Sequence, residues 1–380
     1  MKIEQKKWTQ EGGWITTSKV ALPSSPQLVL VFGASALVSQ ESVFSEVKAQ
    51  YPSSHIIMMS TAGEILDTSV SDNSLSLSAL YFEKTTLNVR QVEITNSAET
   101  KTVAEALAHS IPTEKLVHVM VFSDGLKVNG TTLVEGITSV LPRRVGLTGG
   151  LVGDGADFKH TYVGLDQVAT EGKIVAVGFY GDALKVSYGS MGGWDPFGPE
   201  RTITKAKDNV LYELDGKPAL EIYKEYLGDK AKELPGSGLL FPLSLSLPGT
   251  DGVSQVVRTI LAVNETDHSM TFAGTMPEGV KAQLMKANFE RLVGGASSAA
   301  SMIKEFNARA ELAILISCVG RKLVLKERIE EETEAIREVF GPDTVLAGFY
   351  SYGEISPGSP TASQCELHNQ TMTITTFEER

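Results

Sequence analysis

The chain has 380 residues, of which 42% are hydrophobic and 21% are charged, as is typical of a globular protein with two or three domains. Its formal net charge of -12 argues against nucleic acid as a partner, because binding a phosphate backbone depends on lysine and arginine. No apolar run reaches the ~18 residues that a membrane span needs, and no apolar segment follows the charged N-terminus as in a secretory signal. The two cysteines have no disulfide or metal-site spacing, so we expect a cytoplasmic protein without membrane insertion.

The first regular unit follows a polar lead-in, residues 1–24. The apolar run 28–32 predicts a buried strand, and residues 41–50 predict a helix. A second apolar run ends in Ser-Thr-Ala-Gly-Glu-Ile at 60–65, and residues 75–81 then alternate with the period of two of an antiparallel strand. The unit is therefore βαβ-like, with a tight turn after its second strand.

A second, looser copy of this unit covers residues 116–190. Its turn, Gly-Gly-Leu-Val-Gly-Asp-Gly at 149–155, contains four glycines, which permit positive φ or a close approach of the backbone to a ligand. The turn lacks the glycine order of a nucleotide-binding loop. Gly149, Gly150 and Asp154 are therefore candidate ligand contacts, and a purely structural turn is the alternative.

The middle of the chain contains a cluster of glycine and proline around Trp194, whose large ring must pack on a neighbour or cover a pocket. Residues 219–228 then predict a helix, with Pro218 before its first turn and Gly228 at its end. We place the boundary between two lobes at this helix.

The last part of the chain repeats the first unit. The apolar run 312–316 and the helical stretch 327–339 lead to Ala-Gly-Phe-Tyr-Ser-Tyr-Gly-Glu-Ile at 347–355, which echoes the segment 60–65. The sequence therefore predicts an α/β protein of two pseudo-repeated lobes, with mixed, largely antiparallel sheets flanked by helices. Corresponding turns of repeated lobes face a shared cleft, so we expect the turns at 149–154 and 352–354 to line one.

Two charged residues of the last unit are candidates for binding the charged groups of a small ligand. Tyr352 and Glu354 lie two positions apart, on the same side of a strand, where they can bind an ammonium group. Glu354 can instead accept backbone N–H bonds that tie the turn. Arg321 can hold a ligand carboxylate through two parallel hydrogen bonds, or it can pair internally with Glu354.

Cys318 is either a nucleophile, with His368 as a possible base, or a small buried thiol. The run of glutamates at 330–332, with Glu334, indicates a solvated helix face. No metal-binding motif is present. We do not expect an enzyme, because catalysis needs a nucleophile, a base and an orienting group in contact.

Five separated segments, 193–199, 209–219, 317–321, 348–355 and 367–371, resemble, in this order, the FIST family of bacterial sensory domains. The resemblance covers residues 25–380 and implies a FIST N lobe at 25–218 and a FIST C lobe at 219–380. It implies a sensory protein that binds a small, amino acid-like ligand in a cleft between the lobes and signals through a partner protein. His368 and Asn369 belong to the last of these segments, and they join the candidate ligand site with Trp194, Cys318 and Arg321.

Two alternative functions stay open. Some stand-alone members of the family resemble haem-binding nitric oxide sensors that act on a partner histidine kinase. In that case haem b would be the cofactor and His160, just after the glycine-rich turn, the candidate iron ligand; no CxxCH motif is present for covalent attachment. The second alternative is a thiol-dependent enzyme using Cys318.

Overall fold

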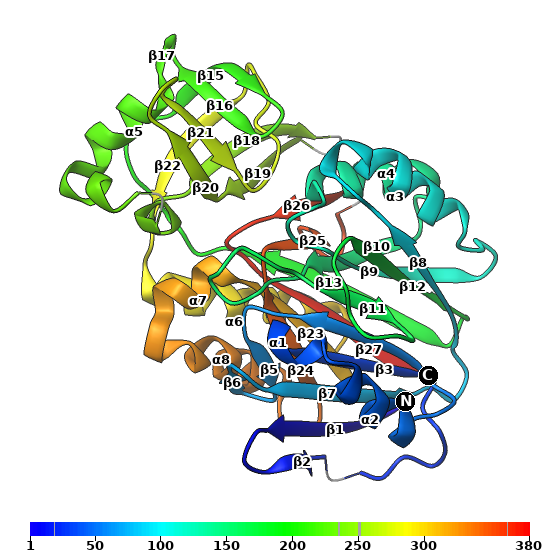
Figure 1. Cartoon of the computed structure of the whole chain (residues 1–380). Coiled ribbons are helices and arrows are strands. Elements are labelled where there is room, and N and C mark those ends of the chain that lie inside the picture. Colours follow the sequence, from blue (N-terminus) through cyan, green and yellow to red (C-terminus); the bar gives the residue numbers. More distant parts are fainter. Residues whose placement is uncertain (19, 235, 250–251, 363) are drawn as a thin grey trace.

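The computed structural model describes residues 1–18, 20–234, 236–249, 252–362 and 364–380 (Figure 1). In this part of the chain, three six-stranded sheets and one nine-stranded sheet are flanked by helices. Most strand pairs are antiparallel, and three central pairs are parallel. The predicted α/β class with mixed, largely antiparallel sheets is therefore confirmed.

The first sheet is built around the strands that the sequence predicted. Strand β3 (Leu28–Gly33) pairs parallel with β4 (His55–Ser60) and antiparallel with β7 (Leu75–Tyr81). Every residue of β3 is buried, as expected for a central strand covered on both faces. The remaining elements of this unit are β1 (Lys2–Thr9), β2 (Gly13–Thr16), α1 (Ser35–Val38) and α2 (Glu41–Gln50).

Two further units repeat this arrangement. In each, a central strand pairs parallel with the strand after its helix and antiparallel with a later strand. The second unit comprises β8 (Thr86–Glu93), α3 (Thr100–His109), β9 (Leu116–Ser123), α4 (Gly130–Val140), β10 (Gly146–Leu151) and β12 (Lys173–Tyr180). The third comprises β13 (Leu184–Met191), α6 (Phe289–Phe306), β23 (Leu312–Cys318), α7 (Val319–Leu325), α8 (Glu330–Phe340), β24 (Val345–Ser351) and β27 (Met372–Glu379).

The three units exchange strands in a closed cycle. From the first unit, β5 (Glu64–Leu66) pairs with β24 and carries β6 (Ser69–Ser71) into the third sheet. From the second unit, β11 (Val163–Leu165) pairs with β4 of the first sheet. From the third unit, β25 (Gly353–Pro357) pairs with β10, and β26 (Cys365–His368) extends the second sheet. The turns that follow β4, β10 and β24 therefore pass from one unit to the next.

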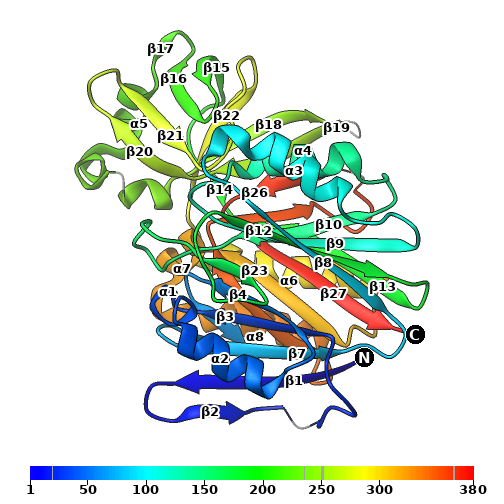
Figure 2. The ribbon, with the colours of Figure 1, turned by 45° about the vertical axis from the view of Figure 1, so that its right-hand side comes forward.

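The nine-stranded sheet forms a separate domain inserted between β13 and α6, with its own hydrophobic cluster around Ile203, Tyr223 and Phe272. Figure 1 and Figure 2 show it standing above the three sheets. Residues 218 and 219, where we placed the lobe boundary, lie inside this domain at the start of α5 (Ala219–Leu227). Its strands are β14 (Asp195–Pro196), β15 (Arg201–Lys207), β16 (Val210–Leu214), β17 (Lys217–Pro218), β18 (Leu243–Gly249), β19 (Gly252–Arg258), β20 (Ile260–Asn264), β21 (Ser269–Phe272) and β22 (Lys281–Lys286).

A buried ion pair holds the third unit together. Arg321 of α7 donates from Nε and Nη2 to Glu332 Oε2 at 3.0 and 2.7 Å, and both side chains are inaccessible to solvent. Arg321 also donates to the carbonyl oxygens of Gly192 and Leu292, each at 2.7 Å. The glutamate run is therefore not uniformly solvated. The prediction fails at Glu332, since this position of α8 faces inward, whereas Glu330 is exposed.

We expect Glu332→Gln to lower the free energy of unfolding by about 3–5 kcal/mol, because it leaves the Arg321 charge buried without a counter-ion. The matched control is Glu331→Gln on the same helix, whose partner Arg328 is partly exposed, and we expect a much smaller loss because solvent screens this pair. Chemical denaturation measures both values. Equal effects of the two substitutions would contradict this account of the pair.

Candidate functional site

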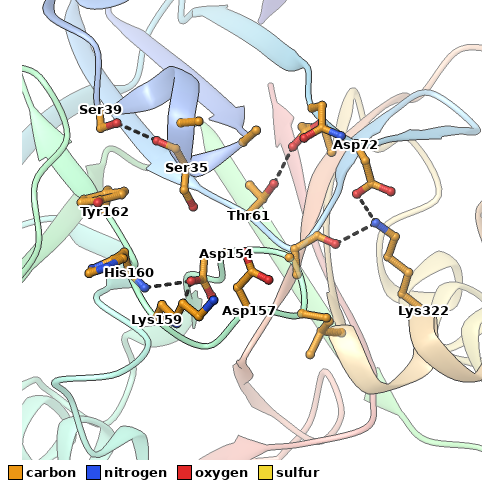
Figure 3. Close-up of a pocket in the computed structure, with 18 of the residues that line it drawn as sticks. Ser35, Ser39, Thr61, Asp72, Asp154, Asp157, Lys159, His160, Tyr162 and Lys322 are labelled. Atoms are coloured by element: carbon orange, nitrogen blue, oxygen red, sulfur yellow. Dashed lines mark hydrogen bonds and ion pairs between the residues drawn. The ribbon is translucent and has the colours of Figure 1, made fainter.

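A cavity of about 650 Å³ lies where the three units meet (Figure 3). The first unit contributes the start of α1, the turn after β4 and the turn before β7, the second contributes the loop 154–162, and the third contributes α7. Its polar lining residues include Ser35, Ser39, Thr61, Glu64, Asp72, Asp154, Asp157, Lys159, His160, Tyr162 and Lys322. The cavity is therefore a product of the strand exchange.

One side of the cavity is formed by Lys322, which is already neutralised. Its Nζ donates to the Ala62 carbonyl oxygen at 2.9 Å and pairs with the carboxylate of Asp72. Gly63 has a φ of 140°, and a side chain there would meet Lys322 Nζ at 2.5 Å. The glycine of the repeated motif thus gives room for the lysine.

Glu64 lies buried at the cavity wall. The hydroxyl groups of Thr61 and Ser74 donate to its two carboxylate oxygens at 2.7 and 2.6 Å. Burial raises the pKa of Glu64 to about 7, although both hydroxyl bonds act in the opposite direction. The charge of this wall therefore changes near neutral pH.

The loop 154–162 folds around the carboxylate of Asp154. This carboxylate accepts the backbone N–H groups of Phe158, Lys159 and His160 at 3.0, 2.8 and 2.8 Å. The Tyr352 hydroxyl donates to the same carboxylate. The two turns that the sequence predicted to share a cleft are therefore in contact through Asp154 and Tyr352.

Several polar groups of the cavity have no partner within the described part of the chain, among them those of Asp157, Lys159 and Ser35. The carboxylate of Asp157 and the ammonium group of Lys159 are exposed along the lower edge in Figure 3. The Ser35 hydroxyl oxygen is buried and makes no hydrogen bond to the described residues. The buried Ser35 hydroxyl would gain a partner from a ligand, and the two exposed charges can form charge-assisted hydrogen bonds with it.

Gly149 and Gly150, by contrast, lie within β10, where they pair with Ile355 and Glu354 of β25. A side chain at Gly149 would meet the Val121 carbonyl oxygen at 1.8 Å. Neither glycine lines the cavity. In the structure, Gly149 therefore serves the close approach of two strands.

Glu354 is sealed in the interior. It accepts hydrogen bonds from the Ser351 hydroxyl at 2.7 Å, and from the Thr371 hydroxyl and N–H at 2.9 and 3.2 Å. The carboxylate thus ties the turn, and it shares no partner with Tyr352, which contacts Asp154 and Phe158. Arg321 pairs with Glu332 instead, so the alternative of an internal pair between Arg321 and Glu354 is wrong.

The other predicted residues lie away from the cavity. Trp194 and His368 line a separate cleft of about 470 Å³ beside the inserted domain, and Asn369 is buried. The His368 Nε2 group donates to the Ser356 carbonyl oxygen at 2.9 Å. Cys318 is buried, and burial raises the pKa of its thiol, which opposes a nucleophilic role.

His160 stands at the rim, with 63% of its side chain exposed and Nδ1 2.6 Å from Glu171 Oε1. Apolar groups, including Val319, Leu323 and the Tyr162 ring, share the cavity wall with hydroxyl and charged groups. A haem iron ligand needs an enclosed, apolar setting, and His160, which is largely exposed and bonded to Glu171, does not provide one. Within the described ranges, no group of three His, Cys, Asp or Glu residues can hold a metal ion.

Sequence reasoning missed several residues of the cavity, among them Ser35, Thr61, Glu64, Asp72, Asp157, Lys159, Tyr162 and Lys322. The repeated Gly-Glu-Ile motif contained a signal for Thr61 and Glu64. Ser35 and Lys322 follow β3 and β23, the central strands of two repeated units. Ligand-binding side chains often gather there, at the carboxyl ends of parallel strands. No pattern in the sequence distinguishes Lys159.

The FIST N domain matches residues 27–217, and the FIST C domain matches residues 219–357. The chain therefore belongs to the FIST family, whose domains are sensory domains of signal transduction that bind small ligands. No curated protein matches the chain. Among solved structures, the chain is similar to a cyanuric acid hydrolase from A. caulinodans, with a TM-score of 0.33, 9% identity, and coverage of 94% of this chain and 91% of that one. None of the described helices has both the length and the apolar character of a membrane span.

Glu354→Gln should remove one source of pH-dependent stability. Burial raises the pKa of Glu354 from 4.5 to about 8, so the folded chain keeps a proton that the unfolded chain releases. The associated stabilisation is complete below the lower value and is lost as the pH rises through the higher one. Wild-type stability should therefore fall by up to about 1.4 kcal/mol per pH unit, relative to the variant, in this interval.

Denaturation at several pH values measures this difference. Glu83→Gln, at an exposed glutamate, is the control and should follow the wild type. If the free energies of unfolding of the wild type and of Glu354→Gln change in parallel with pH, the carboxyl group does not titrate in this interval.

Proposed function

We propose that the chain is a cytoplasmic sensor that binds a small zwitterionic, amino acid-like ligand in the cavity between the three units. The observation that supports this proposal is the pair of opposite, unpartnered charges on one loop, Asp157 and Lys159, facing the same space as the buried Ser35 hydroxyl. A ligand that carries both an ammonium and a carboxylate group satisfies both charges at once.

The charge balance of the cavity favours this class of ligand. Lys322 and Asp72 neutralise each other, and the Asp154 carboxylate is saturated by backbone N–H groups. The charged groups left for a ligand therefore include the Asp157 carboxylate and the Lys159 ammonium group, beside the Glu64 carboxyl group, whose pKa is raised to about 7. Charge-assisted hydrogen bonds to such groups are stronger than neutral ones, and the volume of about 650 Å³ lies within the range of small-molecule sites.

Signalling requires a partner protein in this proposal, for example a histidine kinase, because a sensory domain transmits its state by contact. Ligand binding shifts the population of two conformations only through a difference in affinity for them. A thiol-dependent enzyme finds less support, since Cys318 is buried and its thiol pKa is raised. A haem sensor finds less support because His160 is exposed at the rim and its Nδ1 is bonded to Glu171.

Titration calorimetry and thermal shift with each of the twenty protein amino acids test the proposal. Ligand at about 100 times its dissociation constant should add about 2.7 kcal/mol of stability. A set of amino acids and related zwitterions that leaves the transition unchanged would count against the proposed ligand class.

We expect Lys159→Met and Asp157→Asn each to weaken binding by about tenfold or more, since each removes one charged hydrogen bond of about 1.5–3 kcal/mol. Neither substitution should change the stability of the free protein, because both side chains are exposed. Lys101→Met on α3, outside the cavity, is the control and should bind as the wild type does. Retained affinity in both cavity variants would move the site elsewhere.

A further inference from the structure

The loop 154–162 faces two cavities rather than one. Asp157 and Lys159 line the ligand cavity, whereas Phe158, between them, lines a smaller cavity of about 180 Å³. The opposite wall of this second cavity belongs to the inserted domain, through Leu261 and Phe272. A single loop therefore separates the candidate ligand site from the inserted domain.

Tyr352 holds Phe158 in place. The two rings stack with their centroids 4.4 Å apart and an angle of 14° between their planes. The Tyr352 hydroxyl contacts the Asp154 carboxylate, and it accepts the Phe158 N–H at 3.3 Å. Phe158 has a φ of 53°, a conformation that is costly for a bulky residue and persists only when its surroundings impose it. Asp154, Phe158 and Tyr352 therefore form one connected unit.

The inserted domain faces this unit across an incompletely closed surface. Leu126, Phe158 and Leu261, which border the second cavity, are 40%, 37% and 43% exposed. The chain enters the domain after Gly192 and Gly193 and leaves it at residues 286–288. Direct polar contacts with the core include Arg258 Nη1 to the Leu367 carbonyl oxygen at 2.9 Å. The domain also shares a buried apolar cluster with the core, which includes Met285, Leu292 and Val324. We therefore expect a change in its position beside the second cavity rather than a release of the whole domain.

We infer that the Phe158–Tyr352 stack couples occupancy of the ligand cavity to the position of the inserted domain. A group bound between Asp157 and Lys159 displaces the loop, and the loop cannot move without moving the Phe158 ring. Phe158 then changes the wall against which Leu261 and Phe272 rest. The inference rests on the proposed function for its natural ligand, but the coupling itself does not depend on which ligand occupies the cavity.

A covalent group placed in the cavity tests the coupling without the natural ligand. Ser39→Cys provides an exposed thiol at the cavity wall, and Cys365→Ser removes the half-buried native thiol, while Cys318 is buried. Reaction with N-phenylmaleimide then fills part of the cavity. Hydrogen exchange of the peptide covering β20 and β21 reports on the inserted domain.

We expect the adduct to change the exchange rate of this peptide by at least about fivefold, the lower end of typical coupling between sites. The change should be lost in Tyr352→Phe, which breaks the bond to Asp154, and in Phe158→Ala, which removes the stack. Tyr81→Phe, on β7 of the first sheet, is the matched control, and in this variant the adduct should still change the exchange rate.

An adduct that leaves the exchange of β20 and β21 unchanged would overturn the inference, as would a response that persists in both Tyr352→Phe and Phe158→Ala. Amino acid titration of the unlabelled chain is scored separately. If the adduct moves the inserted domain while no zwitterion binds, the coupling stands and the ligand class is wrong. If zwitterions bind and the adduct has no effect, the ligand class stands and the coupling fails.

Discussion

The closed exchange of strands among the three sheets is the constraint on which the rest of the structure depends. Each sheet is completed by a strand from another unit, through the pairs β5 with β24, β11 with β4 and β25 with β10. The backbone groups of these strands find their hydrogen-bond partners only when all three units are present. The three turns that carry the chain between units must therefore converge, and the cavity lies at their convergence.

A buried glutamate with the same kind of hydrogen bonds occurs at two of these turns. Glu64 and Glu354 each accept one hydrogen bond from a hydroxyl group of the turn and one from a hydroxyl group of a later loop or strand. Glu64 lines the ligand cavity, whereas Glu354 is enclosed, and its partner Thr371 lines the separate cleft of about 470 Å³ together with Trp194. The two corresponding glutamates therefore differ in their access to a cavity.

The inserted domain adds a second surface beside the loop 154–162 that lines the ligand cavity. Its own hydrophobic cluster makes it a separate packing unit, and it meets the core beside the loop that lines the ligand cavity. A ligand in the cavity and a partner on the surface can then act on the same loop. Such a position suits a sensory protein, in which a small binding event must alter a surface that another protein contacts.

The sequence by itself determined the class of the fold, the repeated units and the family. Periodicity of two and runs of apolar residues are local signals, so β3, β7 and β23 were predictable, and so was the echo of the segment 60–65 at 347–355. The contact of Asp154 with Tyr352 followed from the expectation that repeated turns face one another.

Only the tertiary structure decided which charges are free. Glu332, Arg321 and Glu354 look like surface or ligand-binding residues in the sequence, but each finds a partner on a neighbouring element and is buried. Asp157 and Lys159 stay available because, among the described residues, none pairs with their side chains. The packing of one element on another decides such pairings, and it leaves no periodic signal in the sequence.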